Sequence, residues 1–379
     1  MSLRLPRVLL LSCVLALSGC AQLGYYAQAA HGHLALMAAA RPIDQVRADP
    51  ATPDRLAALL GRAELMRRFA SDTLGLPDNA SYTRYAELRR DFAVWSVSST
   101  AEFSLELDTW CYPVIGCASY RGYFDESAAL AYAERLRAEG RDVAVAGVSA
   151  YSTLGWFADP LLNTFVSGSE LALAGLIFHE LAHQRLYVRD DSGFNEAFAT
   201  AVELIGVSLW IDAHGDARER EQWRALVARR ASFLALLAQT RVELSAVYAS
   251  SATPAEKRLR KRSIFADLQG RYLELRARWQ DWPGYDRFFR YALGNANLAA
   301  LGAYHDRVPG FLALFAQAGQ DWRAFYAAAE ALAASAPATR DAELTRLAQR
   351  CRTETDSLRC NIETRARESG ELGAQGYDS

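Results

Sequence analysis

The chain has 379 residues, of which 51% are apolar, enough to build one large hydrophobic core or two ordinary ones. Its 42 basic and 44 acidic residues give a formal net charge of −2. This balance argues against a nucleic-acid partner and against a polybasic membrane-binding surface.

Residues 1–19 are predicted to be a signal peptide that is not part of the fold. Arg4 and Arg7 precede an apolar run at 8–17, which is too short to span a bilayer as a helix. The run ends in the sequence LSGC at 17–20, which resembles the lipobox of bacterial lipoproteins. The resemblance implies that Cys20 is lipidated and becomes the first mature residue.

The residue after Cys20 is Ala21, not an aspartate. Where lipoproteins are sorted by this position, the resemblance implies an outer-membrane protein that faces the periplasm. Several acyl chains would give stable anchoring in the membrane. The alternative is an ordinary signal peptide that happens to contain a cysteine.

The first part of the mature chain is predicted to hold a small sheet crossed by one helix. Apolar spacing of three to four residues predicts helices, and alternation with β-branched and aromatic residues predicts strands. In chain order we expect a tether at 21–42 leading into a helix, helices at 55–74 and 85–93, strands at 94–107 and 120–124, a helix at 125–140 and a strand at 142–149.

From Ser169 onward nearly every segment has helical spacing, with helices expected at 169–188, 195–213, 218–250, 254–279, 285–304 and 310–334. The two longest are predicted to pair as a helical hairpin, an arm over about 218–280 that projects from the body. Its basic run, KRLRKR at 257–262, is expected to be a solvated helix face, with a binding role as the alternative.

These elements predict an α+β fold that is mostly helical, with a small β-sheet and a long helical hairpin. Residues 20–368 are expected to form a single domain. The tail at 369–379 is polar and contains glycine, so it is expected to be disordered.

Four cysteines remain after the signal peptide and the lipidation site, namely Cys111, Cys117, Cys351 and Cys360. Two local pairs in a protein outside the cytoplasm favour two disulfides. Cys111–Cys117 and Cys351–Cys360 is the preferred pairing among three connectivities. A zinc site built from these cysteines is the weaker alternative, because the spacing is not that of a metal knuckle with nearby histidines.

The sequence HELAH at 179–183 carries the strongest chemical signal. Residues four apart lie on one face of a helix, so His179 and His183 can reach one metal ion. Glu180 is rotated by about 100° from His179, which suits a general base acting on a metal-activated water. The apolar residues before the motif predict a buried helix, where two histidines need a partner. Zinc would supply it.

The third ligand is expected from the following helix. The sequence NEAFA at 195–199 resembles the glutamate helix of gluzincin metallopeptidases, which implies Glu196 as the ligand. The alternative is an acid placed there by the helix dipole. Glu203, two turns on, is expected to orient a histidine from outside the ligand set, or to be the ligand if the register differs.

Several segments together resemble the zinc aminopeptidase family of proteobacterial lipoproteins. They are HELAHQ at 179–184, DD at 190–191, FNE at 194–196, YSTLGW at 151–156 with DP at 159–160, and NANL at 295–298 leading to Tyr304. The resemblance implies a gluzincin-like zinc peptidase core acting on peptides. It also implies Tyr304 as a hydrogen-bond donor to the tetrahedral oxyanion, with His305 as its rival.

A segment at 143–156 is a candidate edge strand for pairing with an extended substrate, with an ordinary core strand as the alternative. The expected function is a zinc-dependent peptidase, and an aminopeptidase in particular. Two alternatives stay open: an endopeptidase on the same zinc centre, and a non-catalytic lipoprotein that binds zinc.

Overall fold

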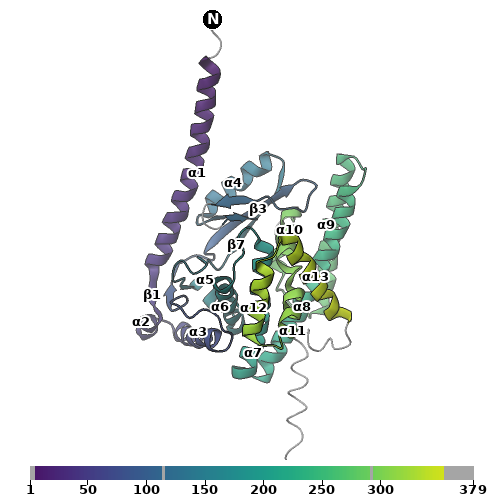
Figure 1. The fold of residues 1–379 in the computed structure, drawn as a ribbon. Coiled ribbons are helices and arrows are strands. Elements are labelled where there is room, and N and C mark those ends of the chain that lie inside the picture. The colour runs from purple at the N-terminus through teal and green to yellow at the C-terminus, as the bar shows by residue number, and fades with distance from the viewer. Residues whose placement is uncertain (1–4, 113–115, 291–292, 354–379) are drawn as a thin grey trace, which may run out of the picture.

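The computed structural model describes residues 5–112, 116–290 and 293–353, without the side chains of 5–21, 303–305 and 351–353 (Figure 1). It is mostly helical with small sheets, as expected for the α+β class. The chain begins with α1 (Leu5–Ala39), whose N-terminal half extends beyond the rest of the molecule. The expected tether at 21–42 is therefore helical as far as Ala39. Its inner part packs on the body: Gln28 accepts a hydrogen bond from Phe124 N, and Arg121 lies over the Tyr25 ring.

The predicted small sheet is present. Strand β3 (Val94–Ala101) lies between β6 (Arg121–Tyr123) and β7 (Arg141–Val148), and both pairings are antiparallel. Helix α4 (Glu126–Ala138) crosses between β6 and β7 and starts at Asp125, whose carboxylate accepts a hydrogen bond from Ala128 N. Among the strands that the structure describes, β7 pairs only with β3 and is therefore an edge strand.

The helix predicted at 85–93 is wrong. Residues Arg84–Ala86 form β2, which pairs with β1 (Ala40–Pro42) and with β8 (Leu161–Leu162). Tyr85 and Ala86 are buried by these partners, and Arg89 has a φ of 52°, which no α-helix accommodates. Pairing with two distant segments thus overrides a local apolar pattern that looks helical.

The predicted disulfide between Cys111 and Cys117 is present. β4 (Trp110–Tyr112) and β5 (Gly116–Ala118) form a two-stranded hairpin joined by the disulfide Cys111–Cys117. The hairpin is tied to the loop at 186–191, because Cys117 N donates to an Asp190 carboxylate oxygen at 2.6 Å. Cys360 lies outside the described residues, as does the side chain of Cys351, so the second pairing stays a prediction.

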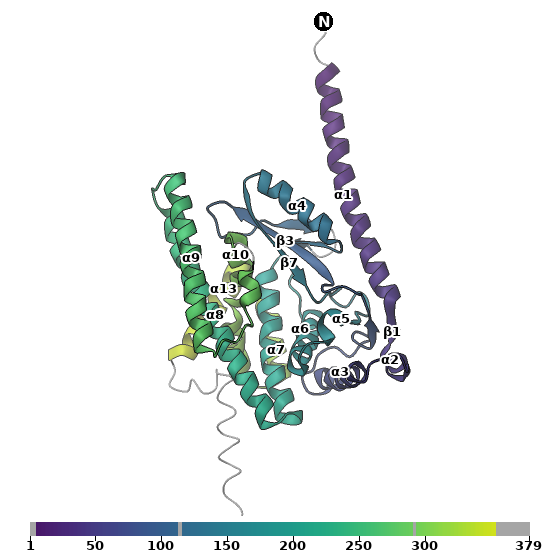
Figure 2. The ribbon, with the colours of Figure 1, turned by 180° about the vertical axis from the view of Figure 1, so that it is seen from behind.

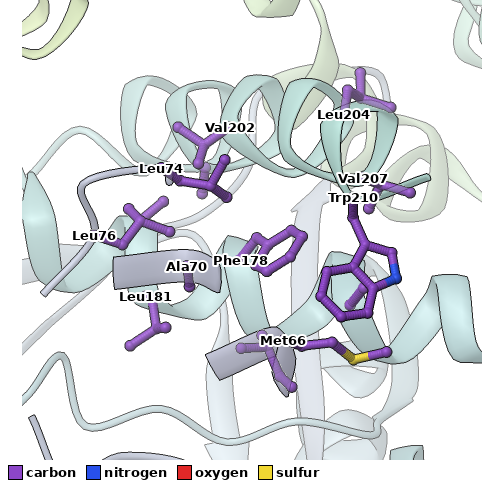
Figure 3. Close-up of a cluster of buried hydrophobic side chains, with 14 of the residues drawn as sticks. Met66, Ala70, Leu74, Leu76, Phe178, Leu181, Val202, Leu204, Val207 and Trp210 are labelled. Atoms are coloured by element: carbon purple, nitrogen blue, oxygen red, sulfur yellow. The ribbon is translucent and has the colours of Figure 1, made fainter. Parts of the chain in front are cut away.

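The main core lies where α3 (Asp54–Asp72), α6 (Glu170–Arg185) and α7 (Ser192–His214) pack together, beside the short α2 (Ile43–Ala48) and α5 (Asn163–Val166). Figure 3 shows side chains from the three long helices in contact, with Phe178 in the middle of Met66, Ala70, Leu74, Val207 and Trp210. Because Phe178 is fully buried, its truncation to alanine would cost about 3–5 kcal/mol.

Helix α7 is long and apolar enough to cross a membrane, and it is the one such helix found in the described part of the chain. Its most apolar stretch is 78% buried inside the protein. Burial on this scale is what a central core helix requires, since its apolar surface already has a partner.

The predicted helical hairpin exists as α8 (Ala217–Ala249) and α9 (Pro254–Arg278), each opened by a capping box. Its two helices share a second core cluster that includes Phe233, Leu244, Leu268 and Tyr272. The hairpin does not project from the body as expected. Figure 2 shows α9 running along the molecule to the level of α4.

Ion pairs near the hairpin tip join it to the β3–β7 sheet. Arg258 pairs with Glu102, and Lys261 pairs with Asp142 at 2.7 Å. Lys257 donates to the backbone oxygen of Tyr248. The basic run at 257–262 is therefore partly a structural contact and is not the simple solvated face that we expected.

The C-terminal helices are shorter than predicted. The segment 285–304 is divided into η1 (Asp286–Phe289) and α10 (Asn295–His305), and α10 starts after Gly294. The segment 310–334 is divided into α11 (Val308–Gln317) and α12 (Trp322–Ala333), because Gly319 and Gln320 have positive φ and Asp321 caps the next helix. A further helix, α13 (Pro337–Thr353), was not predicted. The tail at 369–379 lies outside the described residues.

Candidate metal centre

Helix α6 presents the two histidines of the HELAH sequence on one face. It starts at Ser169, whose hydroxyl accepts a hydrogen bond from Ala172 N. His179 and His183 are one turn apart, and their Nε2 atoms lie 3.2 Å from each other. Two imidazole nitrogens at this distance need a shared proton or a cation between them, because two unprotonated nitrogens would both be acceptors.

Helix α7 brings Glu196 to the same point. One oxygen of its carboxylate lies 3.3 Å from His179 Nε2, and the other lies 3.6 Å from His183 Nε2. The preceding residue fixes this approach: the buried Asn195 side chain accepts from Val188 N and donates to Val188 O, both at 2.7 Å. Asn195 thereby closes the loop between the two helices.

The start of α7 is also held from the C-terminal part of the chain. Asp191 caps the helix by accepting from Phe194 N. Its carboxylate pairs with Arg307 at 2.7 Å and with the buried Arg340 of α13 at 2.9 Å. The position of Glu196 therefore depends on α11 and α13 as well as on its own helix.

These three side chains can hold a metal ion. Their ligand atoms all lie within 4.8 Å of one another. Ligands at 2.0–2.1 Å from a tetrahedral zinc stand about 3.3 Å apart, which is close to the 3.2, 3.3 and 3.6 Å separations in the site. Two neutral nitrogens and one carboxylate are also a donor set that suits zinc.

Glu203 lies outside this ligand set. Its carboxylate reaches the other ring nitrogen, Nδ1, of His179 at 3.2 Å, and its second oxygen pairs with Arg230 of α8 at 3.3 Å. Burial would raise the pKa of Glu203, but the hydrogen bond with His179 and the charge of Arg230 outweigh it, so the pKa is lowered. An ionised carboxylate in this place keeps the proton on Nδ1 and leaves Nε2 free to bind a metal.

Without a metal ion, the two histidines differ in their protonation. Burial tends to lower the pKa of His179, but its hydrogen bonds to Glu196 and Glu203 raise the pKa well above the ordinary value. Burial lowers the pKa of His183, the Glu196 carboxylate raises it and the neighbouring His179 lowers it, so that the pKa is about 4. His183 Nδ1 is buried and has no hydrogen-bond partner among the described residues. His183 is thus neutral and ready to act as a ligand.

The geometry agrees with the family relationship. The sequence profile of the family described as "Putative aminopeptidase" matches residues 24–344. The chain belongs to this family. Neither the curated proteins nor the solved structures contain a significant match. The family's description points to a peptidase, a hydrolase of peptide bonds.

In this member of the aminopeptidase family, Glu180 occupies the side of α6 next to the two histidines. Burial raises the pKa of its carboxyl group to about 7. The positive charge on His179 lowers the pKa, the carboxylates of Glu196 and Asp159 raise it, and a hydrogen bond from Ser152 lowers it. A carboxyl group that titrates near neutral pH is suited to accepting and returning a proton.

Two loops brace this side of the helix. In the first, the buried Asp159 carboxylate accepts from Thr153 N and Oγ1 at 2.9 and 2.8 Å and from Ser152 Oγ at 3.4 Å. In the second, Tyr82 N donates to Asp159 O at 2.6 Å. The Tyr82 ring is buried, and the carboxylates of Glu180 and Asp159 add to the burial that raises its pKa.

Gln184, which follows the second histidine, attaches the same loops to α6. Its side chain accepts from Asn79 at 2.7 Å and donates to Ser81 at 3.2 Å. A Cβ atom at Gly155, which has a φ of +83°, would lie 3.5 Å from the Gln184 side chain. The loop before Trp156 therefore lies directly against α6, the helix of the two histidines.

The sequence does not reveal every residue of the site, and the side chain of Tyr304 lies outside the described residues. Arg230 and Tyr82 lie in segments without a functional sequence motif, so only the tertiary structure shows that they belong to the site. Ser152 and Asp159 lie in the segments that resemble the family, but the sequence gives them no role. Tyr304 lies in α10, which packs against α7, but its side chain is outside the described part.

Proposed function

We propose that this protein is a zinc-dependent peptidase, and an aminopeptidase in particular, in which His179, His183 and Glu196 hold the metal. The observation that carries the proposal is the convergence of three ligand atoms from α6 and α7 at the separations of a tetrahedral zinc site. The family match supports a peptide as the substrate.

Zinc in this position would supply a Lewis acid for the scissile carbonyl and make water a nucleophile at neutral pH. Glu180 accepts a proton from the attacking water and returns it to the leaving amine. The pKa of about 7 at Glu180 suits both transfers. Glu203 holds the proton on His179 Nδ1 and so keeps the ring oriented throughout.

Tyr304 is the proposed donor to the oxyanion that forms on the carbonyl, with His305 as the rival residue. The proposal comes from the family resemblance, and the packing of α10 against α7 is compatible with it. Tyr304→Phe should lower kcat by about 10²–10³ and leave KM nearly unchanged. If His305→Gln has that effect instead, the role belongs to His305.

The test of the whole proposal combines metal content with turnover. The purified protein should contain one zinc per chain and should release amino acids one at a time from peptides with a free N-terminus. Acetylation of that N-terminus should abolish release. Cleavage inside acetylated peptides would favour the endopeptidase alternative, and a protein without zinc would overturn the proposal.

We also propose that the enzyme is anchored by lipid on Cys20 and faces the periplasm from the outer membrane. The lipobox-like sequence at 17–20 supports this placement, and the Cys111–Cys117 disulfide is typical of proteins outside the cytoplasm. Cys20→Ser should abolish labelling with radioactive palmitate and move the protein out of the membrane fraction. Retention of both properties would refute the anchor.

A further inference from the structure

The Glu203 carboxylate lies between a metal-binding histidine and an arginine of the helical hairpin. One oxygen is 3.2 Å from His179 Nδ1 and the other is 3.3 Å from Arg230 Nη1. All three side chains are largely buried, with 18, 21 and 26% of their surface exposed for His179, Glu203 and Arg230. A carboxylate in such a place keeps its charge and its direction best when each oxygen has a donor.

The packing of α8 on α7 puts Arg230 at this carboxylate. Trp223 of α8 is buried, and its indole N–H donates to Ser208 of α7 at 3.1 Å. Val227 packs against the main core one turn later. Residues 223, 227 and 230 follow the i, i+4, i+7 spacing of one helix face, so the contacts that dock α8 also deliver the guanidinium to Glu203.

A glycine of α6 lies against the Glu203 side chain. Gly175 is one helical turn before His179, and a Cβ atom there would lie 3.3 Å from Glu203 Cγ and 3.6 Å from its Oε1. The absence of a side chain at Gly175 leaves room for the Glu203 side chain that reaches His179 and Arg230. The side chain is therefore confined by Gly175 on one side and by its two partners at the tip.

We propose that Arg230 is a positioning residue of the metal centre, which fixes the Glu203 carboxylate on His179 and thereby raises the zinc affinity of the site. Arg230 is not one of the three residues proposed to hold the metal, and it acts through Glu203. The inference rests on the proposed zinc function and extends it to α8. It assigns the first half of the helical hairpin a part in holding the metal centre.

The experiment measures zinc dissociation constants of the full chain by competition with a chromophoric chelator. Loss of a residue that supports a metal ligand typically weakens metal binding by 10–100-fold. Arg230→Gln should therefore weaken zinc binding by about tenfold or more. Arg230→Lys keeps the charge without the planar fork, and a loss of about threefold is expected.

A matched control stands on the same helix. Arg224 pairs with the exposed Glu221 within α8, so Arg224→Gln removes a guanidinium of the hairpin without touching Glu203. Zinc affinity should be unchanged in this variant. The melting temperatures of the zinc-free variants are measured in parallel, and all should stay close to that of the zinc-free parent.

The same Arg230 substitutions are then measured in a protein that also carries Glu203→Gln. If Arg230 acts through Glu203, then Arg230→Gln or Arg230→Lys should cause no further loss of zinc affinity once Glu203 is replaced. If Arg230→Gln fails to fold, the zinc affinity of Arg230→Lys with and without Glu203→Gln still tests the inference. Additive losses, unchanged affinity in Arg230→Gln, or an equal loss in Arg224→Gln would each overturn the inference while leaving the zinc peptidase standing. A parent protein that binds no zinc would instead refute the proposed function itself.

Discussion

The side-chain amide of Asn195 exchanges two hydrogen bonds of 2.7 Å with the backbone of Val188. This pair closes the connection between α6 and α7 immediately before Glu196, and so sets the distance between the ligands of the two helices. Asn195 is 2% exposed. Its amide is therefore a buried structural link and not a group that reaches the substrate.

Asn195→Ala should destabilise the protein, because it leaves the N–H of Val188 without its partner and leaves Val188 O with only the 3.3 Å hydrogen bond from Asp191 N. One unsatisfied group costs about 1–3 kcal/mol, so a loss of about 1–3 kcal/mol is expected in urea unfolding of the zinc-free protein. Zinc affinity should fall as well. Asn195→Asp keeps only the acceptor for Val188 N and should lose less. Full stability in Asn195→Ala would contradict the role given to this link.

Glu180→Gln should separate metal binding from catalysis. The amide has nearly the shape of the carboxylate but cannot accept the proton, so kcat should fall by about 10²–10⁴. Zinc stoichiometry, measured by atomic absorption, should remain at one. Glu196→Ala is the contrasting variant, because it removes a ligand and should lose zinc and activity together. Wild-type turnover in Glu180→Gln would favour the non-catalytic alternative or another general base.

The zinc-free protein should show the raised pKa of Glu180 as a dependence of stability on pH. The pKa is about 7 in the folded state against an ordinary 4.5, so the folded state keeps a proton that the unfolded state has already released. Stability contributed by Glu180 must therefore fall as the pH rises through this window. The fall is up to about 3 kcal/mol, at about 1.4 kcal/mol per pKa unit.

The comparison with Glu180→Gln isolates this contribution, because His179 and His183 titrate in both proteins. Urea unfolding of the two zinc-free proteins from pH 5 to pH 8 should show the variant gaining on the parent as the pH rises. A constant difference across this range would mean that Glu180 has an ordinary pKa. The measurement requires chelator throughout, since a bound cation would lower the pKa of the carboxyl group.

Replacing Cys111 and Cys117 together by alanine should lower stability by about 2 kcal/mol, as expected from chain entropy for a short disulfide loop. The hairpin also donates from Cys117 N to Asp190 in the loop between α6 and α7. Zinc affinity should therefore fall modestly in the same variant. Non-reducing peptide mapping checks the bond, and it tests the predicted Cys351–Cys360 pair in the same experiment.

Local sequence was sufficient for the elements whose pattern and end signals agree. The helices that carry His179 and Glu196, the helix α4 between two strands, and the hairpin α8–α9 all have regular apolar spacing with capping residues at their starts. The spacing of the histidines is likewise a property of one helix. These features depend on neighbours within about one turn, so they can be predicted from the sequence.

Predictions failed where the deciding contact lies far away in the chain. At Tyr85, pairing with Arg41 and Leu161 makes a strand out of an apparently helical pattern. Past residue 308 the reason is local instead, because the positive φ at Gly319 and Gln320 divides a continuous apolar pattern into two helices. The hairpin was predicted to project, but the ion pair of Lys261 with Asp142 ties it to the sheet.

The sequence by itself determined the chemistry of the centre: two imidazoles one turn apart, a carboxylate beside them and another at the start of the next helix. The tertiary structure decided which groups support that chemistry, since Arg230, Tyr82 and Asp159 reach the site from separate segments. The physical reason is that ligand spacing is set by the geometry of one helix, whereas charge, burial and hydrogen-bond partners depend on how distant segments pack.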